Sequence, residues 1–139
     1  MTYTEDALVE QPAINLFSEL NWDTVTCWDE IFGSLDDANL ADNPLFFGRE
    51  TRNDVVLFAR LKAALLKLNP DVSKLIIQEA IDEIARDRSA MTPIAANEEV
   101  YGLLTNGYVY ITNAEDEDDC VVRYVDWSSA CNNDFLLCS

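Results

Sequence analysis

Four stretches of the chain carry apolar side chains at every third or fourth position, a spacing that predicts amphipathic helices. The predicted helices span residues 4–20, 51–68, 73–86 and 93–105. The start of the last one is the plainest, because the hydroxyl of Thr92 caps a first turn and Pro93 lacks the N–H that would be unpaired there. Pro12 interrupts the first pattern, and it predicts either a kink or a helix start near Gln11.

The residues that begin, end and line these helices give further expectations. Thr4 and Ser73 are expected N-caps, and Thr51 with Asp54 resembles a capping box. Asn21 is expected to end the first helix. The side chains expected on buried faces include Ala13, Leu16, Phe17, Leu20, Val55, Leu65, Ile77, Ile81 and Ile94.

Aromatic and β-branched residues gather in shorter segments between the helices, which predicts strands. The predicted strands span residues 22–28, 108–112 and 120–127, with a further strand at 135–138. Residues 29–50 are expected to form a long loop. Residues 113–119 are expected to form an acidic turn, which lacks the residue order of an EF-hand calcium loop. The element order predicts one α+β or α/β domain with helices packed on a small mixed sheet.

The charge balance narrows the range of partners. The chain has 26 acidic side chains against 9 lysines and arginines and no histidine, so its formal net charge is −17. This charge argues against a grip on a phosphate backbone, which depends on lysine and arginine. It suits basic partners, or one lobe of a larger protein whose basic surface lies elsewhere. The sequence has no secretion signal and no apolar run of about 18 residues, so we expect a cytoplasmic protein without membrane contact.

Several kinds of active site are excluded by what the sequence lacks. Without histidine, Ser-His-Asp and Cys-His catalysis are excluded, and neither the P-loop nor the G-x-G-x-x-G pattern occurs. Residues 49–52 (RETR) form either a functional clamp or a capping and ion-pair cluster. Arg86, Arg88 and Arg123 lie near the ends of predicted elements, where we expect structural rather than DNA-contacting roles.

The four cysteines form no CxxC pair, and with no histidine in the chain a zinc site is not expected. We expect reduced, mostly buried thiols, with a disulfide between Cys131 and Cys138 as the alternative. No other cofactor site is evident in the sequence, so we expect this chain alone to hold neither a metal nor a nucleotide.

Five segments of the chain form a distinctive set when taken together. They are residues 4–11 (TEDALVEQ), 48–52 (GRETR), 65–70 (LLKLNP), 80–100 (AIDEIARDRSAMTPIAANEEV) and 132–135 (NNDF). This set resembles the N-terminal region of the R (restriction) subunit of type I restriction–modification enzymes. The resemblance implies the opening part of a PD-(D/E)xK-type nuclease domain, followed in the R subunit by two helicase-like motor lobes. It also implies Mg²⁺, ATP, double-stranded DNA, and partnership with methylation and specificity subunits.

One site residue follows from the resemblance. Nucleases of this type often bring a glutamate from their first helix to the metal site, and Glu10 matches by position. The family's catalytic Asp and Glu-x-Lys follow the strand at 132–135, and this chain has no Glu-x-Lys there. The resemblance therefore implies a truncated domain with an exposed sheet edge at 134–138 and no nuclease or ATPase activity of its own. The alternative is a free-standing acidic protein that binds a partner or mimics DNA.

Overall fold

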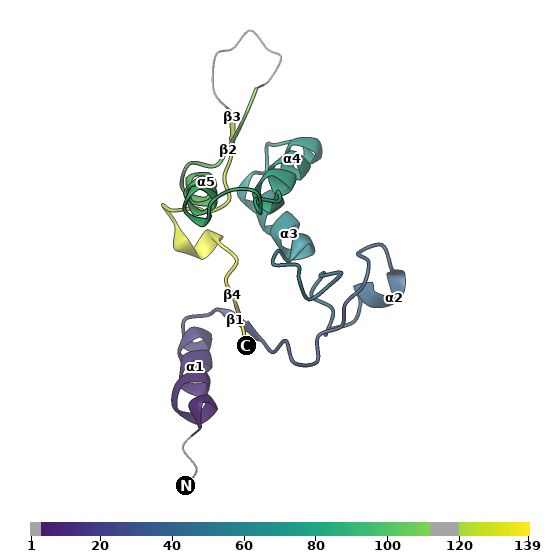
Figure 1. Cartoon of the computed structure of the whole chain (residues 1–139), viewed down its shortest axis with the longest axis vertical. Coiled ribbons are helices and arrows are strands. Elements are labelled where there is room, and N and C mark those ends of the chain that lie inside the picture. The colour runs from purple at the N-terminus through teal and green to yellow at the C-terminus, as the bar shows by residue number, and fades with distance from the viewer. Residues whose placement is uncertain (1–3, 112–119) are drawn as a thin grey trace. The chain divides into compact units, whose positions relative to one another are not determined.

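The computed structural model describes residues 4–111 and 120–139 of the chain. The chain forms two compact units, which we call unit 1 (residues 1–51 and 134–139) and unit 2 (residues 52–133). Helices and short strands occur in both (Figure 1), so the fold is mixed α+β, as predicted. The described strands pair as two separate two-stranded sheets, so the prediction of one mixed sheet is wrong. The acidic turn predicted at 113–119 lies outside the described residues.

Unit 1 begins with a helical segment whose first part is wider than an α-helix. The π-turn η1 (Asp6–Glu10) leads directly into α1 (Gln11–Glu19), and Pro12 is the second residue of α1. The N–H of Gln11 bonds to the carbonyl of Asp6, five residues back. The wider turn accommodates Pro12, which has no N–H to donate and would clash with a regular preceding turn. The predicted start near Gln11 is therefore confirmed for the α-helical part.

Asn21 ends this helix, as predicted, with a φ of 63° that is uncommon outside glycine. The N–H of Trp22 donates to the carbonyl of Phe17, and the N–H of Asn21 donates to that of Ser18, each at 3.0 Å. These two bonds define a Schellman motif. The Trp22 ring lies 4.7 Å from the Phe17 ring and is stacked at 4.7 Å on Phe135. The aromatic contact joins the end of the first helix to a segment near the end of the sequence.

The sheet of unit 1 consists of β1 (Asp23–Val25) and β4 (Leu136–Cys138), paired in parallel with Thr24 opposite Leu137. Within the described residues β1 is the one strand that pairs with β4. Both strands are shorter than the predicted segments at 22–28 and 135–138. A sheet this small covers little of α1.

The first helix consequently buries less than its pattern predicted. Ala13 and Phe17 are half-buried, whereas Leu16 and Leu20 are exposed. Residues 29–50 are mostly irregular, as predicted. They contain the short helix α2 (Ala38–Ala41) and an isolated parallel bridge between two residues, Ile31 and Phe46.

Unit 2 starts its first helix later than predicted. The helix α3 spans Phe58–Leu68, and Leu57 precedes it without a side-chain cap. The predicted start at 51 and its capping box are therefore wrong, and Val55 is 92% exposed. Two consecutive β-branched valines follow Asn53-Asp54, and all four residues have low helix propensity. The helical spacing of a few apolar residues in this segment does not offset that low propensity.

The next two helices confirm their predictions closely. The helix α4 spans Lys74–Ala85, and Ser73 caps it by accepting the N–H of Ile76 at 3.3 Å. The helix α5 spans Pro93–Asn106, and Thr92 caps it by accepting the N–H of Ala95 at 3.3 Å. Gly107 follows with a φ of 84°, which glycine adopts without strain. One expectation fails here, because Ile94 is 81% exposed.

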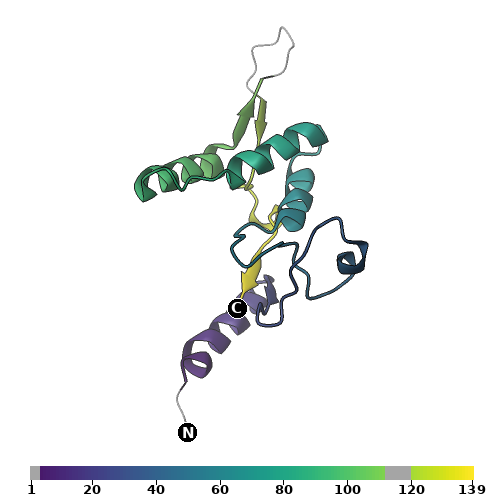
Figure 2. The same ribbon diagram turned by 45° about the vertical axis from the view of Figure 1, so that its right-hand side comes forward.

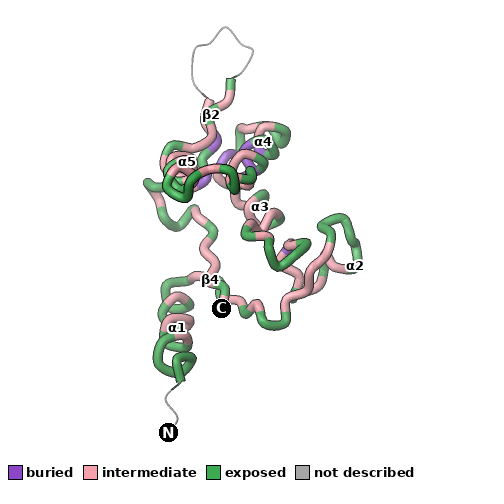
Figure 3. The backbone as a smooth tube through the Cα atoms, in the orientation of Figure 1, coloured by how far each residue is buried: buried purple, intermediate pink, exposed green. Residues whose placement is uncertain are grey.

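The buried core lies in unit 2. The strands β2 (Tyr108–Tyr110) and β3 (Cys120–Val122) pair antiparallel, and α4 packs against both (Figure 2). Most of the buried positions gather around α4 and these strands (Figure 3). The buried apolar side chains are Leu65, Ile77, Ala80, Ile81, Val122 and Tyr124. A short 3₁₀ turn, η2 (Ala130–Asn132), follows in the same unit.

Asn69 is the buried polar residue of this core. Its side-chain amide donates to the carbonyls of Leu65 and Arg123, each at 2.9 Å, and its oxygen accepts the N–H of Arg123 at 2.8 Å. The bond to Leu65 is buried and the two bonds to Arg123 are partly buried, so these polar groups need partners within the protein. Asn69 therefore fixes the end of α3 to the chain that follows β3.

Candidate functional site

A groove of about 400 Å³ lies in unit 1 between the first helical segment and the parallel strands. Its polar lining comes from both ends of the sequence. The lining residues are Asp6, Glu10, Gln11, Ile14, Thr24, Val25, Thr26, Trp28 and Ser139. The groove thus brings the one site residue named from the sequence, Glu10, beside the paired strands.

Glu10 is half-buried at the junction of the π-turn and α1. Asp6 lies four residues earlier and lines the same groove, while one of its carboxylate oxygens accepts the side-chain N–H of Gln11 at 3.1 Å. π-turns inside helices are frequent at functional sites, because they shift side chains out of the regular register. Here two acidic residues of the wider turn, Asp6 and Glu10, line one open groove.

Two carboxylates are a partial set of metal ligands. Mg²⁺ is commonly bound through one or two carboxylates, with waters and substrate phosphates completing its six ligands. Glu10 and Asp6 have the right ligand chemistry for such a role. Across residues 4–111 and 120–139, however, no three or more His, Cys, Asp or Glu side chains are grouped to hold a metal ion. Among the residues that line it, the groove therefore offers two acidic side chains and not a complete set of metal ligands.

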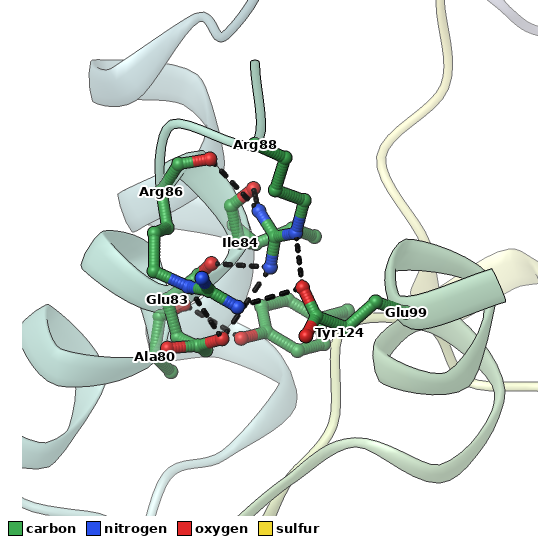
Figure 4. Close-up of polar contacts among 7 residues, drawn as sticks. All are labelled: Ala80, Glu83, Ile84, Arg86, Arg88, Glu99 and Tyr124. Carbon is green, nitrogen blue, oxygen red and sulfur yellow. Dashed lines mark hydrogen bonds and ion pairs between the residues drawn. The ribbon is translucent and has the colours of Figure 1, made fainter. Parts of the chain in front are cut away.

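The arginines of the segment at 80–100 form a separate polar cluster in unit 2 (Figure 4). The side chain of Arg88 is 8% exposed, and its guanidinium faces the end of α4. It donates to the main-chain carbonyls of Glu83 at 2.9 Å, Ile84 at 3.1 Å and Arg86 at 3.0 Å. These carbonyls belong to the last turn and the exit of α4, where the helix has no N–H to offer. Arg88 therefore caps the C-terminus of α4.

The same guanidinium connects α4 to α5. Its Nε atom donates to the carboxylate of Glu99 at 2.6 Å, and Arg86 reaches the same oxygen at 2.7 Å. The hydrogen bond from Arg88 is the main reason that the pKa of Glu99 lies below its usual value. Since the guanidinium of Arg88 is engaged inside the fold, its contacts support the structural role expected from the sequence. The side chain of Arg123 is exposed, and its role stays a prediction.

Arg49 makes an ion pair that the sequence did not reveal. Its guanidinium holds Glu30 through two hydrogen bonds, of which the Nε–Oε1 bond is 2.8 Å long. The Glu30 side chain is 1% exposed, and the Arg49 guanidinium also lies 5.3 Å from the centre of the Phe32 ring. The bond to Glu30 raises the pKa of Arg49. Of the two readings of residues 49–52, these contacts favour the ion-pair cluster.

The loop before β4 is a second feature that sequence reasoning missed. The carboxylate of Asp126 accepts the N–H groups of Ser128 and Ser129 at 2.9 and 3.0 Å, and the side-chain amide of Asn132 at 2.9 Å. These bonds, led by that from Asn132, lower the pKa of Asp126. The side chain of Asn133 bonds to both the N–H and the carbonyl of Asp126, at 2.8 and 2.9 Å. The two asparagines of the NNDF segment thus hold a loop together.

Comparison of the sequence with known proteins identifies the family of the chain. A sequence model of the family described as "Type I restriction enzyme R protein N terminus" matches residues 2–139. The searches of curated proteins and of solved structures gave no match. Among the described helices, none is long and apolar enough to cross a membrane. The family match covers nearly the whole chain, so the chain belongs to the family of type I restriction enzyme R protein N termini, and the family resemblance predicted from its five segments is confirmed.

Proposed function

We propose that this chain is the opening part of the nuclease domain of a type I restriction endonuclease, an ATP-dependent hydrolase that cuts double-stranded DNA in restriction–modification. Units 1 and 2 belong to one PD-(D/E)xK-type domain in this proposal. Glu10 supplies one carboxylate to its Mg²⁺ site. The protein acts in the cytoplasm, in a complex with methylation and specificity subunits.

The observation that carries the proposal is the position of Glu10. A nuclease metal site needs carboxylate oxygens in a groove that is open enough to admit a phosphodiester. Glu10 lines a groove of this kind beside two parallel strands, with Asp6 as a second carboxylate. Family membership supports the expectation of nuclease chemistry, and the groove lined by Glu10 supports its proposed position in this chain.

The residues that line the groove also indicate which catalytic groups other segments of the R protein must supply. Its lining offers no lysine to stabilise charge that develops on a phosphate. We therefore assign the catalytic Asp, the Glu-x-Lys and the ATP-binding motor to segments of the R protein outside this chain. When bound, Mg²⁺ would activate a water molecule and stabilise negative charge on the phosphate. On this account the chain alone neither cuts DNA nor hydrolyses ATP.

The proposal is tested by replacing Glu10 with glutamine in an intact R protein that carries this N-terminus, assembled with its methylation and specificity subunits. The matched control is Glu19→Gln, an exposed residue of the same helix that does not line the groove. We expect Glu10→Gln to lower DNA cleavage by about a hundredfold or more while ATP hydrolysis and translocation stay unchanged. Normal cleavage by Glu10→Gln would remove this residue from the site.

A further inference from the structure

Three exposed side chains follow one another along a wall of the groove in unit 1. Thr24 belongs to β1, and Thr26 and Trp28 come after it at intervals of two residues. Val25 and Cys27, which lie between them, are half-buried, so exposure alternates along this segment. Such alternation places every second side chain on the same face of an extended chain. All three exposed residues line the groove, and we call them the 24–28 row.

Main-chain hydrogen bonds hold the backbone of this row. The N–H of Cys27 donates to the carbonyl of Ser139 at 2.8 Å, and the N–H of Ser139 donates to the carbonyl of Val25 at 2.9 Å. These bonds continue the parallel ladder beyond β1 and β4. On an extended chain, residues two apart such as Thr24 and Thr26 are separated by about 6.6 Å. That spacing is comparable to the separation of successive phosphates along one DNA strand.

The side chains of the 24–28 row are open to a ligand. Within residues 4–111 and 120–139, neither threonine hydroxyl nor the indole N–H of Trp28 is hydrogen-bonded to another residue. The Trp28 side chain is 83% exposed, more than either of the other two tryptophans. A large aromatic ring in an open groove, next to a few polar groups, is typical of a surface that binds a ligand.

The chemistry of the row suits the sugar–phosphate backbone of DNA. Threonine hydroxyls donate hydrogen bonds to phosphate oxygens, and such contacts fix the position of a strand without reading its sequence. An indole ring offers an apolar face that packs against a deoxyribose. The residues that line the groove include no lysine or arginine, so neutral donors carry the contacts of this groove with a strand.

We propose that the 24–28 row binds the backbone of the DNA strand that is cut. The hydroxyls of Thr24 and Thr26 donate to oxygens of neighbouring phosphates, and the Trp28 indole packs on an adjacent deoxyribose. Glu10 lines the same groove from the helical side, so the row holds the strand beside the proposed metal site. This inference rests on the proposed nuclease function and adds to it the residues that position the substrate.

The test measures single-turnover DNA cleavage by the assembled restriction complex, with substitutions in an R protein that carries this N-terminus. We expect Trp28→Ala to slow cleavage about tenfold, and Trp28→Phe to restore most of the rate because it keeps an apolar ring. The double variant Thr24→Val with Thr26→Val loses both hydroxyls at nearly constant volume and should also slow cleavage about tenfold, whereas the corresponding double serine variant keeps the hydroxyls and the rate. Each loss should be equal on DNA of different sequences.

Three further measurements separate a contact with DNA from other roles. The matched control is Trp127→Ala, which changes a tryptophan of unit 2 that is 68% exposed and does not line the groove, and it should cut normally. In the variants of the row, ATP hydrolysis and the Mg²⁺ concentration for half-maximal cleavage should stay at their wild-type values, because the row binds the strand and not the metal. The Tm of the R protein should also stay unchanged.

Normal cleavage by Trp28→Ala or by the double valine variant would overturn the proposal. It would also be overturned if Trp28→Phe were as slow as Trp28→Ala, if Trp127→Ala slowed cleavage equally, or if the slow variants had a lower Tm, which would indicate packing against another segment. Glu10→Gln, measured in parallel, distinguishes this inference from the proposed function. Loss of cleavage in Glu10→Gln with normal cutting by the variants of the row refutes the row alone, whereas normal cutting by Glu10→Gln refutes the metal role of Glu10.

Discussion

Replacing Arg88 with alanine is expected to destabilise unit 2 by about 1.5–3 kcal/mol. The substitution removes hydrogen bonds to three main-chain carbonyls at the end of α4, each worth about 0.5–1 kcal/mol after water regains access. It also removes the ion pair with Glu99, whose side chain is 37% exposed, so that solvent screens the pair and the carbonyl bonds dominate the loss. The low exposure of Arg88, 8%, places the sum in the upper half of single-residue effects.

The assay is urea unfolding of the full chain followed by helical circular dichroism. Hydrogen exchange of α4 amides restricts the readout to unit 2. Arg86→Ala is the matched control, because Arg86 binds the same Glu99 oxygen but is 44% exposed. We expect the control to lower the unfolding free energy clearly less than Arg88→Ala does, because solvent screens the contacts of Arg86. Equal costs for the two variants, or a loss below about 1 kcal/mol for Arg88→Ala, would refute the view that Arg88 caps α4.

Three further predictions concern unit 2. Asn69→Ala leaves the main-chain groups that Asn69 binds without partners, and urea unfolding should show a loss of about 2–3 kcal/mol, whereas a loss under about 1 kcal/mol would contradict the buried hydrogen bonds. Gly107→Ala places a methyl group 2.4 Å from the Val121 side chain and 2.6 Å from the Val122 carbonyl, at a φ of 84°, so thermal unfolding should show a lower Tm than wild type. The folded-state pKa of Glu99 is lowered, so its contribution to stability is complete above its unfolded pKa of about 4.3 and is lost as pH falls through the folded value. When the unfolding free energy is measured at decreasing pH, it should therefore fall less steeply for Glu99→Gln than for wild type. An identical pH dependence of the two proteins would argue against the ion pair.

Local signals in the sequence predicted the parts of the fold that local physics determines. The caps at Ser73 and Thr92 lie next to the N–H groups they bind, so the starts of α4 and α5 were readable from the residues alone. Asn21 was readable as a helix end for the same reason. The start of α3 was missed, because the apolar spacing around Val55 resembles a helix although the backbone there is irregular.

Contacts between residues distant in sequence had no local signal. Nothing around Glu30 indicates Arg49 as its partner, and nothing around Asn69 indicates the chain after β3. The division of the strands into two sheets depends on the pairing of β1 with β4, at opposite ends of the sequence. The candidate site shares this limit. Glu10 was found through resemblance, whereas Asp6 as its neighbour in the groove became evident from the π-turn.

The most direct test of the central claim is the Mg²⁺ dependence of DNA cleavage by the assembled restriction complex, with either glutamate or glutamine at position 10 of the R protein. If Glu10 is a metal ligand, Glu10→Gln raises the Mg²⁺ concentration for half-maximal cleavage by about tenfold or more, while the metal dependence of ATP hydrolysis stays the same. An unchanged midpoint, with cleavage either normal or lowered equally at every Mg²⁺ concentration, would contradict the claim that this chain contributes to the metal site.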